Sequence, residues 1–307
     1  YEGAVHARAG RWVVTGTPSF CASARRRVAQ LRPAPQPGPG QARVVDEGDP
    51  QAFSRALERL LEHIAAGDCY QANLARRLRI SGLDRPLDLY RRLRRRPAEW
   101  GAYLEFDQGA LLSNSPELFL RRRGASVESR PIKGTRPLGL AAELLADPKE
   151  RAELTMIVDL VRNDLGRVCQ PGSVRAEPRA VRTLPTLLHA EQVVSGQLRA
   201  GVDALDLLAA CFPPGSVTGA PKVRAMELIR ELEPAPRGLY TGAVGWLDDG
   251  GDLELSVAIR VAQVRDGEAW VHVGCGIVAD SRSESEVAES ELKFEAWRQA
   301  LPGEPST

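Results

Sequence analysis

Consecutive strand-like segments, separated only by short turns, are the feature that most limits the fold of this chain. The segments are “WGAYLEF” (100–106), “GALLSNS” (109–115) and “ELFLRRR” (117–123). Strands joined by such short turns pair antiparallel, because a parallel pair needs a long crossover connection. The order of these segments therefore predicts an antiparallel sheet.

Helical patterns and further strand patterns fill the rest of the chain without a regular strand–helix–strand alternation. We expect helices over 51–67, 148–165, 203–211, 222–232 and 283–300, and further strands over 69–80, 241–249, 252–267 and 268–280. The stretch “RPAPQPGPGQ” (32–41) is typical of a surface loop. Long sheets interleaved with helices in this irregular order predict a large α+β fold.

The charge balance argues against several classes of partner. The chain has 41 basic and 40 acidic residues, and its net charge of +1 creates no overall field for nucleic acid or a membrane. No apolar run reaches the roughly 20 residues of a membrane helix. Arginine clusters at 25–27, 91–96 and 121–123 fit a nucleic-acid surface, but solvated helix or strand faces are the favoured interpretation. We expect neither nucleic acid nor a membrane as a partner.

The five cysteines are scattered through the chain and form no CxxC pair. This pattern argues against a disulfide framework or a zinc site and favours a reducing cytoplasm. The chain begins with Tyr rather than Met, and we expect it to be a fragment of a longer protein.

Two helical segments carry glutamates at positions i and i+3. Glu150 and Glu153 fall on the mainly apolar face of the segment 148–165, and Glu286 and Glu289 share a face with Lys293. Buried carboxylates are costly unless a cation or hydrogen bonds compensate them. Two such helices suit a hard dication with oxygen ligands, most plausibly Mg²⁺. On spacing alone, exposed acids paired with Arg or Lys are the more common explanation.

Glycine-rich turns provide candidate anion sites. The turn “PPGSVTGAPK” places Thr218 before a helix whose free N–H groups would face it, although it is not a Walker A loop. Gly274 and Gly276 in “GCGIVADS” would let the backbone approach a ligand closely. Ordinary turns remain the alternative for each. Together with Arg260 on the segment 252–267, these turns suggest a ligand with more than one carboxylate.

Two further side chains have a chemical and a structural interpretation. Lys133 in “SRPIKGTRPLG” is one of only four lysines in an arginine-rich chain. A lysine amine can lose its proton and act as a base or nucleophile, which a guanidinium cannot, but a simple loop cation fits equally well. His189 lies in an apolar, helix-like setting, where core packing with one hydrogen bond is the structural alternative.

Taken together, these strings resemble the chorismate-utilising enzymes, a family that includes anthranilate synthase component I, aminodeoxychorismate synthase component I and the isochorismate and salicylate synthases. The similar strings include “GDCYQANLARR”, “SNSPELFL”, “RPIKGTRP”, “RAELTMIVDLVRNDLGR”, “FPPGSVTGAPKVRAMELIRELEP” and “GCGIVADSRSESEVAESELK”. They run in family order from about residue 50 to 300. The resemblance implies an α+β fold with a large antiparallel, sandwich-like core flanked by helices. It also implies a chorismate-binding catalytic domain over 50–303, with 1–49 as a remnant of the family's N-terminal region.

The resemblance implies a role for each site residue. Glu153 and Glu289 resemble direct Mg²⁺ ligands, and Glu150 and Glu286 resemble neighbours that hold the metal's waters. The groups that resemble the holders of chorismate's carboxylates are Tyr240, Arg260, Lys293 and the backbone at Gly274 and Gly276. The residues that resemble the lining of the ring site or of the glycine turn are His189, Thr135 and Thr218.

Two positions discriminate within the family. Isochorismate and salicylate synthases have a lysine base where this chain has Gln71, and a neutral amide cannot deprotonate water. Anthranilate synthases usually have alanine where this chain has Lys133, and lysine there resembles aminodeoxychorismate synthase component I. The implied reaction is amination of chorismate at C4, with Lys133 as a covalent nucleophile at C2 and Glu117 as the acid that protonates the leaving hydroxyl.

Other assignments remain open at this point. We expect the ammonia to come from a separate glutamine amidotransferase subunit, because the chain shows no convincing Cys-His-Glu pattern. Anthranilate synthase component I is the alternative within the family, and a noncatalytic arginine-rich binding protein is the alternative outside it. Cys275 departs from the Gly or Ala usual in the family, and we expect its side chain to narrow the pocket.

Overall fold

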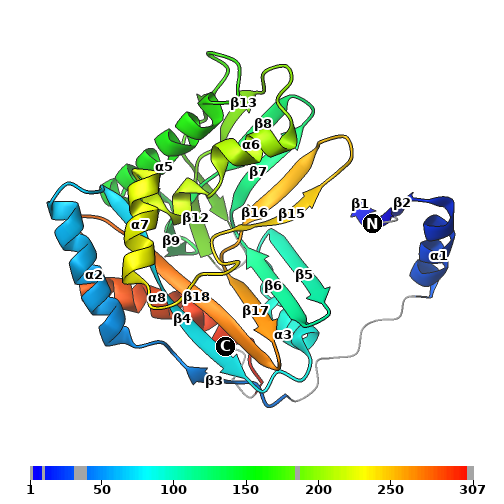
Figure 1. Ribbon diagram of the computed structural model, residues 1–307, viewed down its shortest axis with the longest axis horizontal. Coiled ribbons are helices and arrows are strands. Elements are labelled where there is room, and N and C mark those ends of the chain that lie inside the picture. The colour runs from blue at the N-terminus through cyan, green and yellow to red at the C-terminus, as the bar shows by residue number, and fades with distance from the viewer. Residues whose placement is uncertain (1–2, 9–10, 31–39, 184–186, 303–307) are drawn as a thin grey trace. The chain divides into compact units, whose positions relative to one another are not determined.

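The computed structural model describes residues 3–8, 11–30, 40–183 and 187–302, and the chain divides into two compact units, Tyr1–Gly38 and Pro39–Thr307 (Figure 1). In the first unit, β1 (Gly3–Arg8) pairs antiparallel with β2 (Arg11–Gly16), and α1 (Pro18–Ala29) follows. The hydroxyl of Thr17 caps α1 by accepting a hydrogen bond from the Phe20 N–H at 3.3 Å. Most of the predicted Pro/Gly loop lies outside the described residues.

The described part of the second unit contains three antiparallel sheets (Figure 1). A six-stranded sheet has the order β10-β13-β8-β7-β16-β15, and a sheet with the order β14-β4-β18-β17-β6-β5 also pairs β3 with β4. A three-stranded sheet has the order β11-β12-β9.

The bounds of these elements are as follows. The six-stranded sheet consists of β7 (Leu118–Arg123), β8 (Ser126–Arg130), β10 (Arg175–Ala176), β13 (Val194–Gln197), β15 (Ala243–Leu247) and β16 (Leu253–Val257). The seven-stranded sheet consists of β3 (Arg43–Asp46), β4 (Gln71–Ser81), β5 (Trp100–Phe106), β6 (Gly109–Ser115), β14 (Gly219–Ala220), β17 (Val261–Arg265) and β18 (Glu268–Ile277). The three-stranded sheet consists of β9 (Ile132–Pro137), β11 (Ala180–Thr183) and β12 (Leu187–Glu191). The helices are α2 (Pro50–Ala65), α3 (Pro86–Leu93), α4 (Ala141–Ala146), α5 (Pro148–Gly166), α6 (Ala204–Cys211), the 3₁₀ turn η1 (Gly215–Val217), α7 (Lys222–Leu232) and α8 (Ser283–Arg298).

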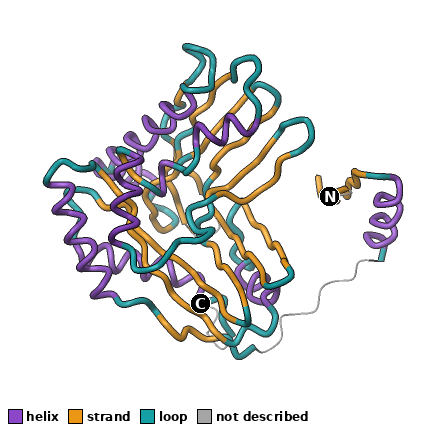
Figure 2. Tube along the Cα trace, viewed as in Figure 1, coloured by secondary structure: helices purple, strands orange, loops and turns teal. Residues whose placement is uncertain are grey.

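Helices α2, α7 and α8 cover the seven-stranded sheet near its long central pair, β4 and β18 (Figure 2). The apolar stripe of α2 meets this sheet through Leu57 and Leu60, which pack with Leu74 of β4 and Leu228 of α7. These four side chains are at most 1% exposed. Helix α5 packs in a separate core against the six-stranded sheet, where Leu154 and Val158 join Val127. The two helical layers therefore stabilise two different sheets.

Helix α5 begins where its sequence predicts. The carboxylate of Asp147 accepts hydrogen bonds from the N–H groups of Lys149 at 2.9 Å and Glu150 at 3.1 Å, and Pro148 occupies the first turn. Arg136 of β9 pairs with the same Asp147 carboxylate at 2.8 Å. The Arg136–Asp147 ion pair thereby connects the start of α5 to β9, the strand that carries Lys133.

The predicted α+β class is confirmed, but three local predictions are wrong. The segments 100–106, 109–115 and 117–123 do not share one sheet: β5 and β6 pair in the seven-stranded sheet, whereas β7 lies in the six-stranded sheet. The segment 252–267 is not one strand: β16 lies in the six-stranded sheet and β17 in the seven-stranded sheet. The chain crosses between them at Arg260, whose φ of 52° is left-handed and cannot continue a strand. His189, expected in a helix-like setting, lies on β12 and pairs with Arg182 of β11. Within the described residues, none of the helices combines the length and apolar character needed to cross a membrane.

Candidate active site

Carboxylates from α5 and α8 face each other. Burial is the main cause that raises the pKa of Glu153; Lys133 opposes it, and the carboxylates of Glu150 and Glu289 add to it. Ligand atoms of Glu286 and Glu289 lie within 4.8 Å of each other, together with the sulfur of Cys275. Like charges gathered in one place disfavour ionisation unless a cation lies between them. The four glutamates therefore fit a Mg²⁺ site in donor type and in charge.

The glutamates differ in their present partners. Glu150 pairs with Arg136 at 3.3 Å, and Glu286 accepts a hydrogen bond from the Ser281 hydroxyl at 2.8 Å. Glu289, whose side chain is half-exposed, pairs with Lys293 at 2.7 Å. Burial acts to raise the pKa of Glu289, but Lys293 and more distant lysines outweigh it and hold the pKa below its ordinary value. Glu289 is thus ionised and ready to bind a cation.

Lys133 and Gln71 both reach the backbone of Gly276. A methyl group at position 276 would lie 2.7 Å from Nε2 of Gln71 and 3.2 Å from Nζ of Lys133. Both polar atoms of the Gln71 amide are buried and lack a hydrogen-bond partner among the described residues. Buried polar groups without hydrogen bonds destabilise a folded core, and a polar ligand above Gly276 would supply hydrogen bonds to the Gln71 amide.

Glu117 is the buried acid of the site. Its backbone is fixed on both sides: the Val257 N–H donates to the Glu117 carbonyl at 3.0 Å, and the Glu117 N–H donates to the Ser115 hydroxyl at 3.3 Å. Burial raises the pKa of Glu117 to about 7, against the opposing effects of the Ser216 hydroxyl and the Lys133 ammonium. A carboxyl group with this pKa is partly protonated at neutral pH, as a general acid requires.

His189 and Thr135 lie next to each other on the paired strands β12 and β9. Nδ1 of His189 is 3.0 Å from the Gly134 carbonyl and 3.2 Å from the Thr135 hydroxyl. A carbonyl only accepts, so Nδ1 carries the proton and Nε2 is the free acceptor. Nε2 is buried without a partner in the described part of the chain. Burial lowers the pKa of His189 to about 4, so its ring is neutral at pH 7.

Arg260, Tyr240 and Lys293 are the candidate carboxylate-binding groups. Arg260 is half-buried, burial lowers its pKa, and no hydrogen-bond or ion-pair partner for its side chain lies among residues 40–183 and 187–302. Burial raises the pKa of Tyr240 to about 12, so the phenol stays protonated and can donate. The Lys293 ammonium donates to the Gly274 carbonyl at 2.7 Å. Burial acts against its charged form, but the Cys275 sulfur and the Glu289 carboxylate hold its pKa above the ordinary value.

Two predicted site residues have mainly structural contacts here. The Thr218 hydroxyl donates to the Pro214 carbonyl at 3.0 Å, and the next residue, Gly219, pairs with β4. Cys275 points toward α8, where its thiol donates to the Glu286 carbonyl at 3.4 Å and packs in the buried cluster beneath α2. Successive residues of β18 project their side chains to opposite faces of the sheet. Cys275 therefore lies on the opposite face of the strand from Gly276 and does not narrow the space above that glycine.

Several polar residues near the site were not predicted from the sequence. Arg136, Ser216, Arg182 and Glu191 all contact or electrostatically influence predicted site residues. Arg136 belongs to the same “IKGTRP” string as Lys133 and could have been found there. Ser216 lies in the quoted turn “PPGSVTGAPK” and could also have been found there, whereas no local pattern marks Arg182 and Glu191.

Known proteins resemble this chain in sequence and in fold. The sequence model of the family described as “chorismate binding enzyme” matches residues 13–299. Aminodeoxychorismate synthase component 1 of Bacillus subtilis (strain 168) is 44% identical over 259 residues, which cover 81% of this chain and 55% of that protein. Anthranilate synthase component 1 of Aquifex aeolicus (strain VF5) is 43% identical over 261 residues, which cover 82% of this chain and 53% of that protein. The chain thus spans about half the length of these two relatives.

The crystal structure of anthranilate synthase component I from Streptococcus pneumoniae TIGR4 is similar to this fold, with a TM-score of 0.86 at 31% sequence identity. The match covers 97% of this chain and 72% of that one. This similarity confirms the fold that the sequence motifs implied.

Proposed function

The chain belongs to the family of chorismate binding enzymes, and from this premise we propose that it aminates chorismate at C4 with ammonia to give 4-amino-4-deoxychorismate. The observation that carries the proposal is the position of Lys133. A primary amine beside Gly276, within reach of a ligand that also touches Gln71, can act as a nucleophile.

In the proposed reaction, chorismate binds through its two carboxylates. The donors for them are the guanidinium of Arg260, which has no partner within the described residues, the ammonium of Lys293 and the phenol of Tyr240. Glu153 and Glu289 would hold Mg²⁺, with Glu150 and Glu286 beside it. When bound, Mg²⁺ would supply positive charge that grips the ring carboxylate and draws electron density from the ring.

The covalent steps then involve two residues of this chain. The Lys133 ammonium first gives up its proton to solvent, and its amine then attacks C2. The ring double bonds shift, and the 4-hydroxyl leaves as water with a proton from Glu117. Ammonia next adds at C4, the double bonds shift back, and the C2–nitrogen bond to Lys133 breaks. The pyruvyl ether stays intact. Gln71 is neutral and cannot activate water, which supports amination over hydration at C2.

Ammonia would come from a separate glutamine amidotransferase subunit, and five unpaired cysteines support a reducing cytoplasm as the location. 4-Amino-4-deoxychorismate is a precursor of 4-aminobenzoate, so we place the reaction on the route to folate or to a related product.

Anthranilate synthesis is the second candidate, because a relative with that name is 43% identical, almost the same as the aminodeoxychorismate relative. To separate the two, the protein is incubated with chorismate, Mg²⁺ and an ammonium salt, and the products are resolved by chromatography and mass spectrometry. 4-Amino-4-deoxychorismate as the main product supports the proposal. Anthranilate with pyruvate supports the second candidate, and no chorismate consumption with or without Mg²⁺ contradicts both.

A further inference from the structure

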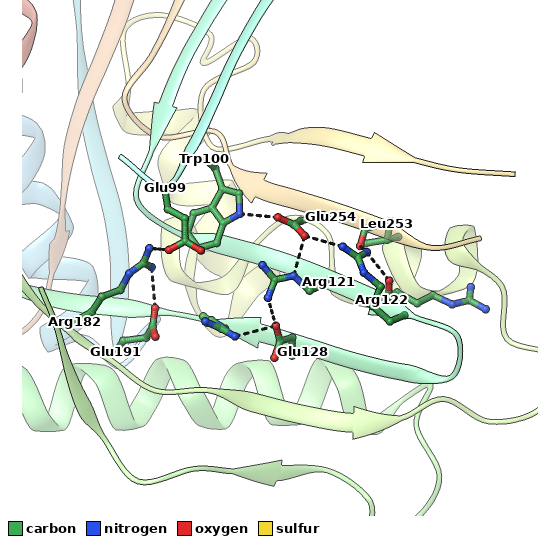
Figure 3. Close-up of polar contacts among 11 residues, drawn as sticks. Glu99, Trp100, Arg121, Arg122, Glu128, Arg182, Glu191, Leu253 and Glu254 are labelled. Atoms are coloured by element: carbon green, nitrogen blue, oxygen red, sulfur yellow. Dashed lines mark hydrogen bonds and ion pairs between the residues drawn. The ribbon is translucent and has the colours of Figure 1, made fainter. Parts of the chain in front are cut away.

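Arg182 of β11 contacts the segment that carries Glu117. One of its nitrogens, Nη1, donates to the carbonyl of Pro116 at 3.2 Å and to the carboxylate of Glu191 at 2.9 Å. Its other terminal nitrogen pairs with Glu99, and its guanidinium lies 4.9 Å from the ring centre of Trp100 (Figure 3). Four contacts fix this side chain, which is 15% exposed.

Glu191 is the second member of the arrangement. It lies on β12, its side chain is 12% exposed, and Arg182 is its ion-pair partner. Its charge acts on Glu117, since the Glu191 carboxylate is one of the groups that raise the pKa of Glu117. Arg182 therefore holds both the backbone just before Glu117 and a carboxylate that raises the pKa of Glu117.

We propose that Arg182 is a positioning residue for the proton donor Glu117, because it fixes the Pro116 carbonyl and clamps the Glu191 carboxylate beside the acid. This inference rests on the proposed function, in which Glu117 protonates the departing hydroxyl. A proton donor must keep its distance and direction to the leaving group, and a displacement of about 1 Å can cost on the order of 10²-fold in rate.

The charges around Glu117 give the expected direction of each change. Lys133 of β9 favours the ionised form of Glu117, and Glu191 of β12 disfavours it. Asp164 of α5 and Ser216 of η1 line a small cavity of about 10 Å³ together with Glu117. Removing the negative charge of Glu191 makes ionisation of Glu117 easier. Its titration midpoint then moves to lower pH.

The first experiment measures Glu117 directly and needs no turnover. Infrared difference spectroscopy follows the C=O band of its protonated carboxyl group, identified by its loss in Glu117→Gln. We expect Glu191→Gln, which is nearly isosteric, to lower the titration midpoint. An unchanged or higher midpoint would overturn the electrostatic part of the inference, whatever reaction the enzyme catalyses.

The second experiment measures chorismate consumption at saturating Mg²⁺ and ammonia. We expect Arg182→Met to lower kcat at least about tenfold while KM for chorismate changes little, the sign of an interaction needed only in the transition state. Arg182→Lys keeps the charge and should recover part of kcat. Arg121→Met is the matched control, because Arg121 also pairs with two glutamates, Glu128 and Glu254 (Figure 3). In the described part of the chain its side chain makes no hydrogen bond to Pro116 or Glu117.

The outcomes separate the two proposals. If the wild-type protein consumes no chorismate, the proposed function fails, and the infrared result stands alone. If the wild type is active but Arg182→Met lowers kcat no more than Arg121→Met, or Arg182→Lys recovers nothing, the positioning role is wrong.

Discussion

Lys133 and Gln71 come from two different sheets and meet at the backbone of Gly276, at 3.2 Å and 2.7 Å from the place a methyl group would occupy there. Lys133 contributes a primary amine and Gln71 a neutral amide. A ligand carbon above Gly276 would lie within reach of both. This pairing, rather than either residue alone, supports amination over hydration.

Replacing Lys133 tests the covalent step. Lys133→Ala should lower amination at C4 by at least about 10²-fold, while chorismate still binds, because the amine forms the bond and other groups hold the carboxylates. Lys133→Arg keeps the positive charge but is a poor nucleophile, and it should be equally inactive. Product analysis and calorimetric titration with chorismate measure the two effects. Turnover close to wild type in either variant would remove the covalent mechanism.

The rate should depend on pH through Glu117. Its pKa of about 7 means that the protonated acid disappears as pH rises through neutrality, so kcat should fall on that side. Glu117→Gln should lower kcat by roughly 10² to 10⁴-fold and abolish the decrease of kcat with rising pH. A pH profile of kcat for both proteins checks the prediction, and a wild-type rate that stays level from pH 6 to 9 would argue against Glu117 as the acid.

Metal binding should depend on Glu289. Glu289→Gln removes one negative oxygen ligand and should weaken Mg²⁺ binding by at least about tenfold, measured by isothermal titration calorimetry. Glu284→Gln is the control, since Glu284 is exposed one turn earlier on the same helix. Equal Mg²⁺ affinity in the two variants would place the metal elsewhere.

Arg260 should contribute to substrate affinity. Its guanidinium has no ion-pair or hydrogen-bond partner in the described part of the chain, and a substrate carboxylate would supply one. Arg260→Met should raise KM for chorismate by about 10 to 100-fold, since a charged hydrogen bond contributes about 1.5–3 kcal/mol. Steady-state kinetics give the value. A KM within twofold of wild type would exclude this contact.

Acid should destabilise the fold through two buried histidines. Burial lowers the pKa of both His189 and His272 to about 4, from an ordinary 6.5. The unfolded chain takes up these protons below pH 6.5 and the folded chain does not, so stability is lost as pH falls from 6.5 toward 4. Each histidine should cost about 2 kcal/mol between pH 7.5 and 5.

His272 offers a way to check this. Its ring stacks on Tyr240 with centres 5.2 Å apart, and His272→Phe keeps an aromatic ring that cannot be protonated. The difference in unfolding free energy between pH 7.5 and 5, measured in urea, should be smaller in this variant. An equal pH dependence in the two proteins would mean that His272 is not buried in its neutral form.

The sequence predicts the longer helices of the second unit because their signals are local, but it misses the short helices α3 and α4. The predicted helix 222–232 coincides with α7, and α5 begins at Pro148 directly after its Asp147 cap. The break at Arg260 has no such signal, since arginine rarely adopts a left-handed backbone and the surrounding residues alternate like one strand. The left-handed backbone at Arg260 follows from tertiary structure, because β16 and β17 pair in two different sheets.

In the candidate site, too, some residues are marked by local sequence patterns and others only by tertiary structure. Helical spacing marks the glutamates of α5 and α8 and rarity marks Lys133, but their proposed roles come from the family resemblance of their motifs. Ser216, Arg182 and Glu191 are joined to Glu117 only by tertiary structure. Their roles depend on distances across three sheets, which no periodicity within one segment encodes.

The pairing of β4 with β18 has a consequence for how the protein is made. Arg79 and Glu268, which lie 3.1 Å apart across these strands, are 189 residues apart in the chain. At about 5–20 residues per second, a ribosome needs roughly 10 to 40 s to reach the second strand after the first. For that time β4 has an unpaired edge that can join foreign strands, and a holding chaperone would protect it. In the proposed function Glu289 and Lys293 bind the metal and the substrate, so activity would appear only once the last helix, α8, has been synthesised.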